Sequence, residues 1–346
     1  MMKTNRISLL LVFSACALAS CGQTKKPKRK SSTDVPTSAI DPTSGIQPTT
    51  TGTSQSWDNY DNYYNGYKMK DMFGPECQFE MHKYFIDQHK TYVKYDQYWS
   101  YGTVGTDLDP ETNKRELFYT AKQVHKSNNS GLSLNREHVW PCANSSDLWY
   151  RDSPFTEHKI DTNANYWGGG SDLFHIRPAY GPVNSARSNA LFYTFSDEEK
   201  ASGNLKQTGE SGGAYKIWTD SKPSKVEVDP YFLGDVARII AYIFIHYSAY
   251  GDYNVYYSAN YTPVYSLAEA VKASTTHSPY VCGTLNLTDI LAYGSEAECR
   301  QKLIEWNRID PPSKVEKNRN DYVQSVQGNR NPFIDFPQLM ELAFDF

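Results

Sequence analysis

The sequence predicts an α+β fold, a mixed single domain in which short strands precede several packed helices. Two short runs, 116–124 and 172–176, have the length and residue content of strands. A broad apolar face over 230–250 predicts a long buried helix, and two helix-capping signatures follow it. With 346 residues, 39% of them hydrophobic, the chain can bury a sizeable core in about one or two domains.

The first twenty residues have the pattern of an export signal. Lys3 and Arg6 precede an apolar run over 7–19, which is too short to span a bilayer as a mature helix. Leu-Ala-Ser-Cys, ending at Cys21, resembles the bacterial lipobox, which implies a lipidated Cys21. We therefore expect residues 1–20 to be a lipoprotein signal peptide and the protein to be exported and anchored at the membrane surface. The alternative is an ordinary secretion signal with a cysteine nearby.

Residues 21–56 are predicted to be a disordered tether. A charge run over 25–30 is followed by Ser/Thr/Pro-rich sequence with almost no apolar side chain. Such a segment cannot bury enough surface to offset its ordering entropy. The folded domain is therefore expected to cover residues 57–346.

Local patterns predict the elements of this domain in chain order. Apolar residues at helical spacing predict a helix over 74–89. Residues 107–110 resemble a solvated turn, and 203–213 resemble a polar loop. In the long helix over 230–250, His246 is interpreted as a core residue rather than a ligand.

Two capping boxes predict the C-terminal helices. Ser295 with Glu298 begins one helix, which Pro311 and Pro312 end. Ser313 and Glu316 repeat the device for another helix running to about residue 327.

The charge distribution limits how the protein can bind a polyanion. The formal net charge is −4, but seven of the basic residues lie in the first thirty positions. From Trp57 onward, 28 basic and 37 acidic residues give a net charge of −9. This balance argues against a protein that coats nucleic acid, yet it permits an enzyme with a local basic cleft.

The stretch over 135–189 gathers the groups that carry chemistry. An acid–base pair, Glu137-His138, begins it, and a helix-compatible run with Asn184 and Arg187 closes it. A histidine that activates water, together with oxygen ligands for a cation, suits metal-assisted phosphodiester hydrolysis.

Three segments carry a resemblance to a known family. They are Asn-Arg-Glu-His-Val-Trp-Pro at 135–141, Asp-Leu-Phe-His-Ile-Arg-Pro at 172–178 with Val-Asn-Ser-Ala-Arg-Ser-Asn at 183–189, and the C-terminal run from Asp310-Pro311 to Asp335. The chain resembles the bacterial secreted endonuclease I nucleases of the ββα-metal, or His-Me finger, class. The resemblance covers most of the sequence after the tether, and it implies a domain built around a ββα-metal motif.

The resemblance also implies roles for individual residues. His138 would be the general base. Glu137 and Asn184 would be oxygen ligands of one hydrated Mg²⁺, with Ca²⁺ or Mn²⁺ as alternatives. An arginine would neutralise phosphate charge. Arg187 and Arg177 match the family's basic positions best, and Arg151 is a third candidate.

Each of these residues also has a purely structural interpretation. Glu137 and His138 could form a surface ion pair, Asn184 could cap its helix, and Arg187 could pair with a helix acid. His175 is expected to orient other residues of the site or to stabilise the fold. Residues 329–331 are expected to stabilise a turn. The sequence departs from many family members at Phe174, where a histidine is common, and at Cys142.

The implied substrate is DNA, and RNA as well. A membrane is the other implied partner, through lipidated Cys21, and we expect a monomer. Two rival functions are a catalytically inactive nucleic-acid-binding lipoprotein and an adhesive surface lipoprotein. Neither accounts for the acid–base pair and all three segments together.

Four cysteines lie beyond the signal and anchor positions, and an exported protein can form disulfides. Four cysteines allow three pairings. Proximity in sequence favours Cys282 with Cys299, which leaves Cys77 with Cys142.

Overall fold

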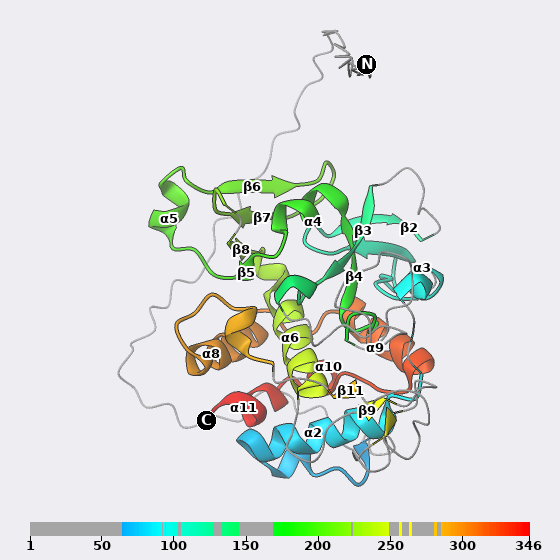
Figure 1. The fold of residues 1–346 in the computed structure, drawn as a ribbon. Coiled ribbons are helices and arrows are strands. Elements are labelled where there is room, and N and C mark those ends of the chain that lie inside the picture. The colour runs from blue at the N-terminus through cyan, green and yellow to red at the C-terminus, as the bar shows by residue number, and fades with distance from the viewer. Residues whose placement is uncertain are drawn as a thin grey trace, which may run out of the picture. The chain divides into compact units, whose positions relative to one another are not determined.

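Helix α6 (Leu233–Tyr247) runs through the middle of the folded part, with the strands of residues 114–138 and 176–227 at one end and the helices of residues 74–88 and 296–344 around the rest (Figure 1). All of its side chains except that of Phe244 are buried, as its broad apolar face predicted. The predicted helix over 230–250 is confirmed as the 3₁₀ turn Pro230–Phe232 followed by α6. Gly234 lies where α6 meets the carbonyl of Asp310, and a Cβ at this position would collide with that oxygen.

The computed structural model describes residues 64–91, 93, 95–102, 105–126, 133–144, 169–222, 224–248, 256–257, 263–264, 280–281 and 285–346. The predicted signal peptide, the lipobox, the tether and Arg151 lie outside these ranges. Within the described ranges, no helix is both long and apolar enough to cross a membrane.

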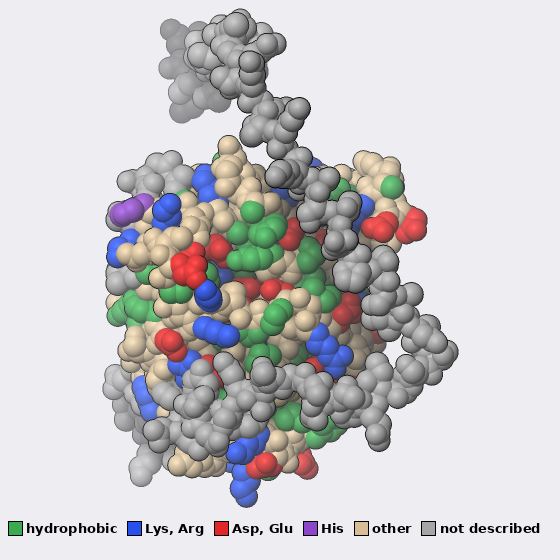
Figure 2. Space-filling view, turned by 180° about the vertical axis from the view of Figure 1, so that it is seen from behind, with side chains coloured by type: hydrophobic (Ala, Val, Ile, Leu, Met, Phe, Trp, Pro, Cys, Tyr) green, Lys and Arg blue, Asp and Glu red, His purple; other side chains and the backbone are tan. Residues whose placement is uncertain are grey.

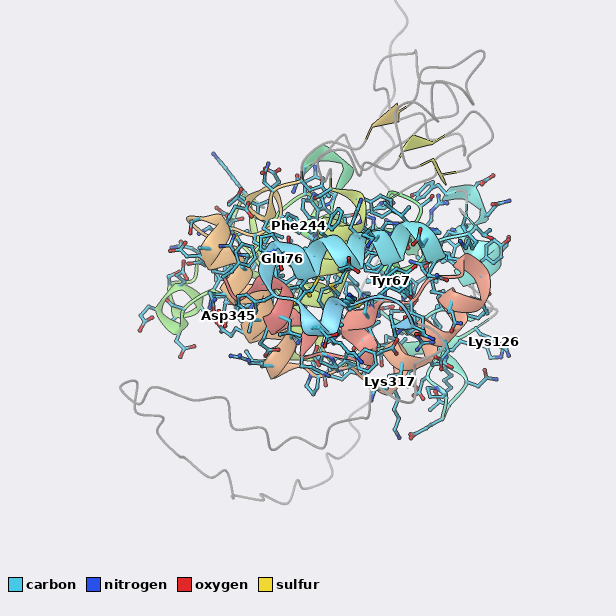
Figure 3. All side chains as sticks on the ribbon, turned by 90° about the horizontal axis from the view of Figure 1, so that it is seen from below. Tyr67, Glu76, Lys126, Phe244, Lys317 and Asp345 are labelled. Carbon is cyan, nitrogen blue, oxygen red and sulfur yellow. The ribbon has the colours of Figure 1, made fainter. Side chains whose placement is uncertain are left out.

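Five helices lie around α6 or next to its neighbours: α2 (Gly74–Gln88), α8 (Glu296–Ile309), α9 (Lys314–Gln327), α10 (Pro332–Asp335) and α11 (Leu339–Phe344). Helices α2, α8 and α10 contact α6, and α11 packs against α2 and α8. Viewed from below, α2 crosses this end of the molecule with Glu76 near one end and Tyr67 near the other (Figure 3). The predicted helix over 74–89 is confirmed.

The capping predictions differ in outcome. At α9 the box is complete, because Ser313 accepts from the Glu316 amide and Glu316 accepts from the Ser313 amide. At α8 only half of it forms: Ser295 caps the Glu298 amide, whereas the Glu298 carboxylate accepts from the Gly294 amide instead.

The site is positioned by a strand pair and a helix. β3 (Leu134–His138) pairs antiparallel with β4 (Ile176–Tyr180), and α4 (Gly181–Arg187) follows β4 directly. The strand predicted over 172–176 was wrong, since β4 begins only at Ile176. Residues 172–175 form a turn because the Asp172 carbonyl accepts from the amides of His175 and Ile176.

The region predicted as one strand over 116–124 is instead a hairpin beside β4. β1 (Lys114–Leu117) pairs antiparallel with β2 (Lys122–His125). Tyr119 and Ala121 in the turn have φ of 70° and 48°, a left-handed conformation that ends the extended run.

A four-stranded sheet has the strand order β5-β8-β7-β6. Its strands are β5 (Leu191–Phe192), β6 (Lys206–Gly209), β7 (Lys216–Thr219) and β8 (Lys225–Glu227). The polar loop expected over 203–213 contains β6, which has no buried side chain and is held by its backbone pairing with β7. Only tertiary pairing therefore defines this edge strand.

The remaining elements are short. They are α3 (Tyr98–Gly102), α5 (Asp197–Ala201), β9 (Tyr256–Tyr257), β10 (Pro263–Val264), β11 (Tyr280–Val281) and the 3₁₀ turns Met69–Asp71, Tyr95–Gln97, Cys142–Asn144 and Leu287–Asp289.

A chain of buried ion pairs joins β4 to the helices. Asp107, expected in a solvated turn, is fully buried, because it lies between the guanidinium groups of Arg177 and Arg319. Arg177 Nη1 also lies 2.9 Å from an Asp235 oxygen on α6. On the same helix, Arg238 binds both carboxylate oxygens of Glu316 at 2.7 Å. The solvated-turn prediction for Asp107 was therefore wrong.

The favoured disulfide pairing was also wrong, because Cys77 and Cys299 are buried free thiols. The Cys77 thiol donates to the Met69 carbonyl at 3.2 Å, and Cys299 faces the core from α8. Burial raises the pKa of Cys77 to about 12. The side chains of Cys142 and Cys282 lie outside the described residues.

Asp107→Asn tests the buried ion pairs. The amide keeps the shape of the side chain but leaves two buried guanidinium groups without their shared anion. We expect the free energy of unfolding to fall by about 3–5 kcal/mol, measured by urea denaturation. The exposed Glu111→Gln is the control and should leave the midpoint near that of the unsubstituted protein. Equal midpoints for both variants would contradict a structural role for Asp107.

Candidate active site

The β3–β4–α4 unit carries all five predicted site residues. His138 and Glu137 lie at the end of β3, and Asn184 and Arg187 lie on α4. Because successive strand side chains point to opposite faces, Glu137 enters the core whereas His138 and Arg136 share the half-buried face. The fifth residue, Arg177, lies opposite Glu137 in the register of β4.

His138 is held as a neutral imidazole. Its Nε2–H donates to the Gly170 carbonyl at 2.9 Å, and because a carbonyl can only accept, this contact assigns the proton to Nε2. The ring also stacks on Tyr95, with centroids 5.3 Å apart. Burial, reinforced by His175, lowers the pKa of His138 well below its ordinary value. The imidazole therefore carries its basic lone pair on Nδ1 at neutral pH.

His175 fastens the segment that holds His138. Its Nδ1–H donates to the Gly169 carbonyl at 2.7 Å, and its Nε2 accepts from the Trp140 amide at 2.8 Å. Burial lowers its pKa to about 4. These contacts match the orienting role expected for His175.

Glu137 is a buried carboxylate with two close partners. The Tyr119 hydroxyl donates to its Oε1 at 2.6 Å, and Arg187 Nε lies 3.4 Å from the same oxygen. Burial raises the pKa of Glu137, while Arg187 and Tyr119 oppose that shift. Glu137 forms no ion pair with His138, so the surface-pair interpretation is wrong.

Asn184 is half-buried in the middle of α4. Its Nδ2 donates to the Arg136 carbonyl at 3.5 Å, which directs the side chain toward the backbone of β3 one residue before Glu137. The N-cap of α4 is Tyr180, so Asn184 does not cap its helix. The carboxylate of Glu137 and the amide oxygen of Asn184 are hard donors of the kind that Mg²⁺ prefers, and the donor set therefore fits such an ion.

Both predicted arginines are buried and engaged by protein groups. Arg187 donates to backbone carbonyls, with Nη2 2.6 Å from the Val139 oxygen and Nη1 3.4 Å from that of His138. Arg177 binds Asp107 and Asp235 and lies over the Phe118 ring. Arg187 thus braces the end of β3, and Arg177 braces β4.

The sequence did not identify three residues at the site: Tyr95, Tyr119 and Arg136. The i, i+2 relation within β3 was a signal that Arg136 shares a face with His138. No local pattern could reveal Tyr95 or Tyr119, because each reaches the site from another element.

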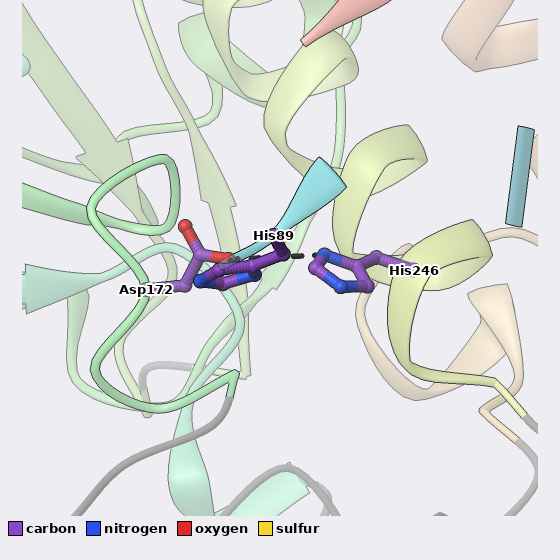
Figure 4. A group of neighbouring side chains, drawn as sticks. All are labelled: His89, Asp172 and His246. Atoms are coloured by element: carbon purple, nitrogen blue, oxygen red, sulfur yellow. Dashed lines mark ion pairs between the residues drawn. The ribbon is translucent and has the colours of Figure 1, made fainter. Parts of the chain in front are cut away.

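A second group of potential metal ligands consists of His89, Asp172 and His246, which we call the Asp172 cluster (Figure 4). Their ligand atoms lie within 4.8 Å of one another, and all three residues are buried. Nδ1 of His89 and of His246 lies 3.9 and 3.8 Å from the Asp172 carboxylate, respectively.

Protein donors already fill this carboxylate. The hydroxyls of Tyr242 and Tyr247 donate to Oδ2 at 2.7 and 2.8 Å. The Phe174 amide and Gln327 Nε2 donate to Oδ1 at 2.7 and 3.1 Å. Four donors match the acceptor capacity of a carboxylate, so these bonds satisfy the Asp172 carboxylate itself. The cluster fixes the turn that follows Gly170, and the interpretation of His246 as a core residue agrees with this.

Comparison with known proteins gives two related results. A family model described as Endonuclease I matches residues 66–338. An extracellular ribonuclease of Bacillus amyloliquefaciens is 32% identical over 231 residues, which are 66% of this chain and 60% of that protein. An extracellular ribonuclease of Bacillus subtilis (strain 168) is 28% identical over 261 residues, 74% of this chain and 69% of that protein. The aligned part is thus less than two thirds of the first relative's length.

His175→Asn should make the protein less sensitive to acid. Below pH 6.5 the unfolded chain protonates this histidine, whereas the folded chain does so only near pH 4, so folding stability is lost as the pH falls through that window. The lost stability is on the order of 3 kcal/mol. An asparagine can donate to Gly169 and accept from Trp140 without titrating.

Urea denaturation at pH 7 and pH 4 measures this difference, with the exposed His125→Asn as the control. A stability loss between the two pH values that is as large in His175→Asn as in the control would contradict the prediction.

Proposed function

The chain belongs to the endonuclease I family, and we propose that it is a metal-dependent endonuclease that hydrolyses DNA and RNA with little sequence preference. The observation that carries this proposal is the His138 imidazole, held neutral on β3 beside Glu137 and Asn184. The β3–β4–α4 order supports assignment to the ββα-metal class.

His138 is the general base in this proposal. Nδ1 removes a proton from water as the water oxygen bonds to phosphorus, and the bond to the leaving sugar oxygen breaks. The leaving oxygen takes its proton from solvent. Because the pKa of His138 lies well below its ordinary value, the base stays unprotonated even in mildly acidic solution.

Glu137 and Asn184 would hold the cation. A Mg²⁺ ion bound there would supply positive charge to the scissile phosphate and the leaving oxygen. Tyr119 and Arg187 position the Glu137 carboxylate, and Arg187 also fixes the backbone at His138. Arg177 holds β4 in place through Asp107 and Asp235.

Substrate binding is proposed to be local and independent of sequence. The domain from Trp57 onward has a net charge of −9, so long-range attraction to a polyanion is not expected. On the face drawn in Figure 2, acidic and basic side chains are interspersed. Contacts to phosphate carry no base information, which suits a non-specific nuclease. The name ribonuclease borne by both relatives supports RNA as a substrate.

We further propose that the protein is an exported monomer, anchored as a lipoprotein through Cys21, with a tether over 21–56 and the nuclease domain over 57–346. The lipobox-like sequence and the polar linker support this arrangement. The relatives are named extracellular, which agrees with export.

His138→Ala should reduce cleavage of both supercoiled plasmid and single-stranded RNA by about 10²-fold or more, since the base is lost. His125→Ala, an exposed substitution, should cleave at the original rate. EDTA should abolish cleavage by the unsubstituted protein, and Mg²⁺ should restore it. Full activity of His138→Ala, or activity unaffected by EDTA, would refute the corresponding part of the proposal.

Glu137→Gln and Asn184→Ala should each raise the Mg²⁺ concentration needed for half-maximal cleavage, because each weakens or removes one oxygen ligand. Isothermal titration with Mg²⁺ should show the same weakening in the absence of substrate. Asn318→Ala is the control, since Asn318 also donates to a backbone carbonyl, that of Leu108. If the cleavage titration and the isothermal titration of a variant both match those of this control, the substituted residue is not a metal ligand.

A further inference from the structure

Arg136, Tyr95 and His138 form a stack at the half-buried face of β3, which we call the Arg136–Tyr95–His138 stack. The Arg136 guanidinium carbon lies 3.6 Å from the centre of the Tyr95 ring. Arg136 Nη1 donates to the Tyr95 carbonyl at 2.8 Å. The Tyr95 and His138 rings are inclined by only 23°. One tyrosine therefore contacts both the guanidinium and the imidazole.

Arg136 differs in its partners from Arg177 and Arg187, the other described arginines of the β3–β4–α4 unit. Arg177 pairs with two carboxylates, whereas Arg187 lies 3.4 Å from Glu137 and donates to backbone carbonyls. Arg136 is half-buried and, among the described residues, has no carboxylate within ion-pair distance. Its positive charge is thus uncompensated on the face that carries the base.

The position of this charge suits a phosphate. Residues two apart on a strand are separated by about 6.5 Å, roughly the span from a general base, through its water, to the far oxygens of a phosphodiester. A guanidinium has five N–H donors in a planar fork, more than the contacts to Tyr95 consume. Such a fork can grip two phosphate oxygens at once.

We propose that Arg136 is a substrate-binding residue that contacts the phosphodiester backbone at the site of cleavage, and that Tyr95 is a positioning residue that orients Arg136 and His138 together. This inference rests on the proposed nuclease function. It assigns the phosphate contact to an accessible arginine, whereas Arg177 and Arg187 brace the two strands from within. The Tyr95 carbonyl accepts from Arg136, and the Tyr95 ring contacts both Arg136 and His138.

The test compares Arg136→Ala, Arg136→Lys and Tyr95→Leu with the control Arg308→Ala, which removes an equal charge from exposed α8. Cleavage of a single-stranded oligonucleotide is measured as kcat/KM over a range of salt concentrations, and thermal melting is recorded for each variant. His138→Ala is run beside them.

Arg136→Ala should lower kcat/KM by roughly ten- to a hundredfold, the scale of one lost charge-assisted contact. It should also flatten the slope of log(kcat/KM) against log salt by about 0.7, one phosphate contact on a single strand. Arg136→Lys should keep the original slope but recover only part of the rate, because lysine lacks the planar fork. Tyr95→Leu should lower the rate while leaving the slope unchanged.

An Arg136→Ala rate and slope equal to those of Arg308→Ala would overturn the inference, provided that His138→Ala is inactive in the same assay. If His138→Ala is fully active, the proposed function itself fails. If Arg136→Ala does not fold, Arg136→Lys decides: a full rate would overturn the need for a fork, and a reduced rate at the original slope would support it.

Discussion

The buried ion-pair chain from Asp107 through Arg177, Asp235 and Arg238 to Glu316 is the constraint on which the structure depends. Ions are costly to bury, and they are tolerated here because each finds an opposite charge within hydrogen-bond or ion-pair distance. The chain connects the turn before β1, strand β4, central helix α6 and helix α9. Since β4 carries the segment that leads to α4, the same interactions that hold the helices together also set the position of the site.

Strand alternation divides the site into a buried half and an accessible half. Glu137 points inward, where Tyr119 and Arg187 fix its carboxylate, while His138 points to the half-buried face beside Tyr95. Tyr119 adopts a left-handed φ of 70°, a conformation that a bulky residue rarely takes without support from its surroundings. Its hydroxyl reaches Glu137 from the turn of the β1–β2 hairpin, so this local strain coincides with a contact of the site.

The Asp172 cluster fixes the turn that holds His138, the proposed general base. Four donors hold the Asp172 carboxylate, and the turn that begins there is continuous with Gly169 and Gly170. Those glycine carbonyls bind His175 and His138, and thereby determine which ring nitrogen of each carries the proton. The buried Asp172 carboxylate is thus linked, through the turn that contains Gly169 and Gly170, to the protonation of His138 and His175.

The sequence by itself determined the long helices, the capping box at Ser313 and the candidate pair Glu137-His138, because these depend on periodicity and on neighbours along the chain. It did not reveal that 116–124 is a hairpin, that Asp107 is buried, or that Cys77 and Cys299 remain thiols. It also could not show that Arg187 points at backbone carbonyls or that Tyr95 contacts both Arg136 and His138. Those outcomes depend on contacts between residues that are distant in the sequence, because a buried charge or hydroxyl needs an ion-pair or hydrogen-bond partner. Such partners are chosen by tertiary packing, and no local pattern records them.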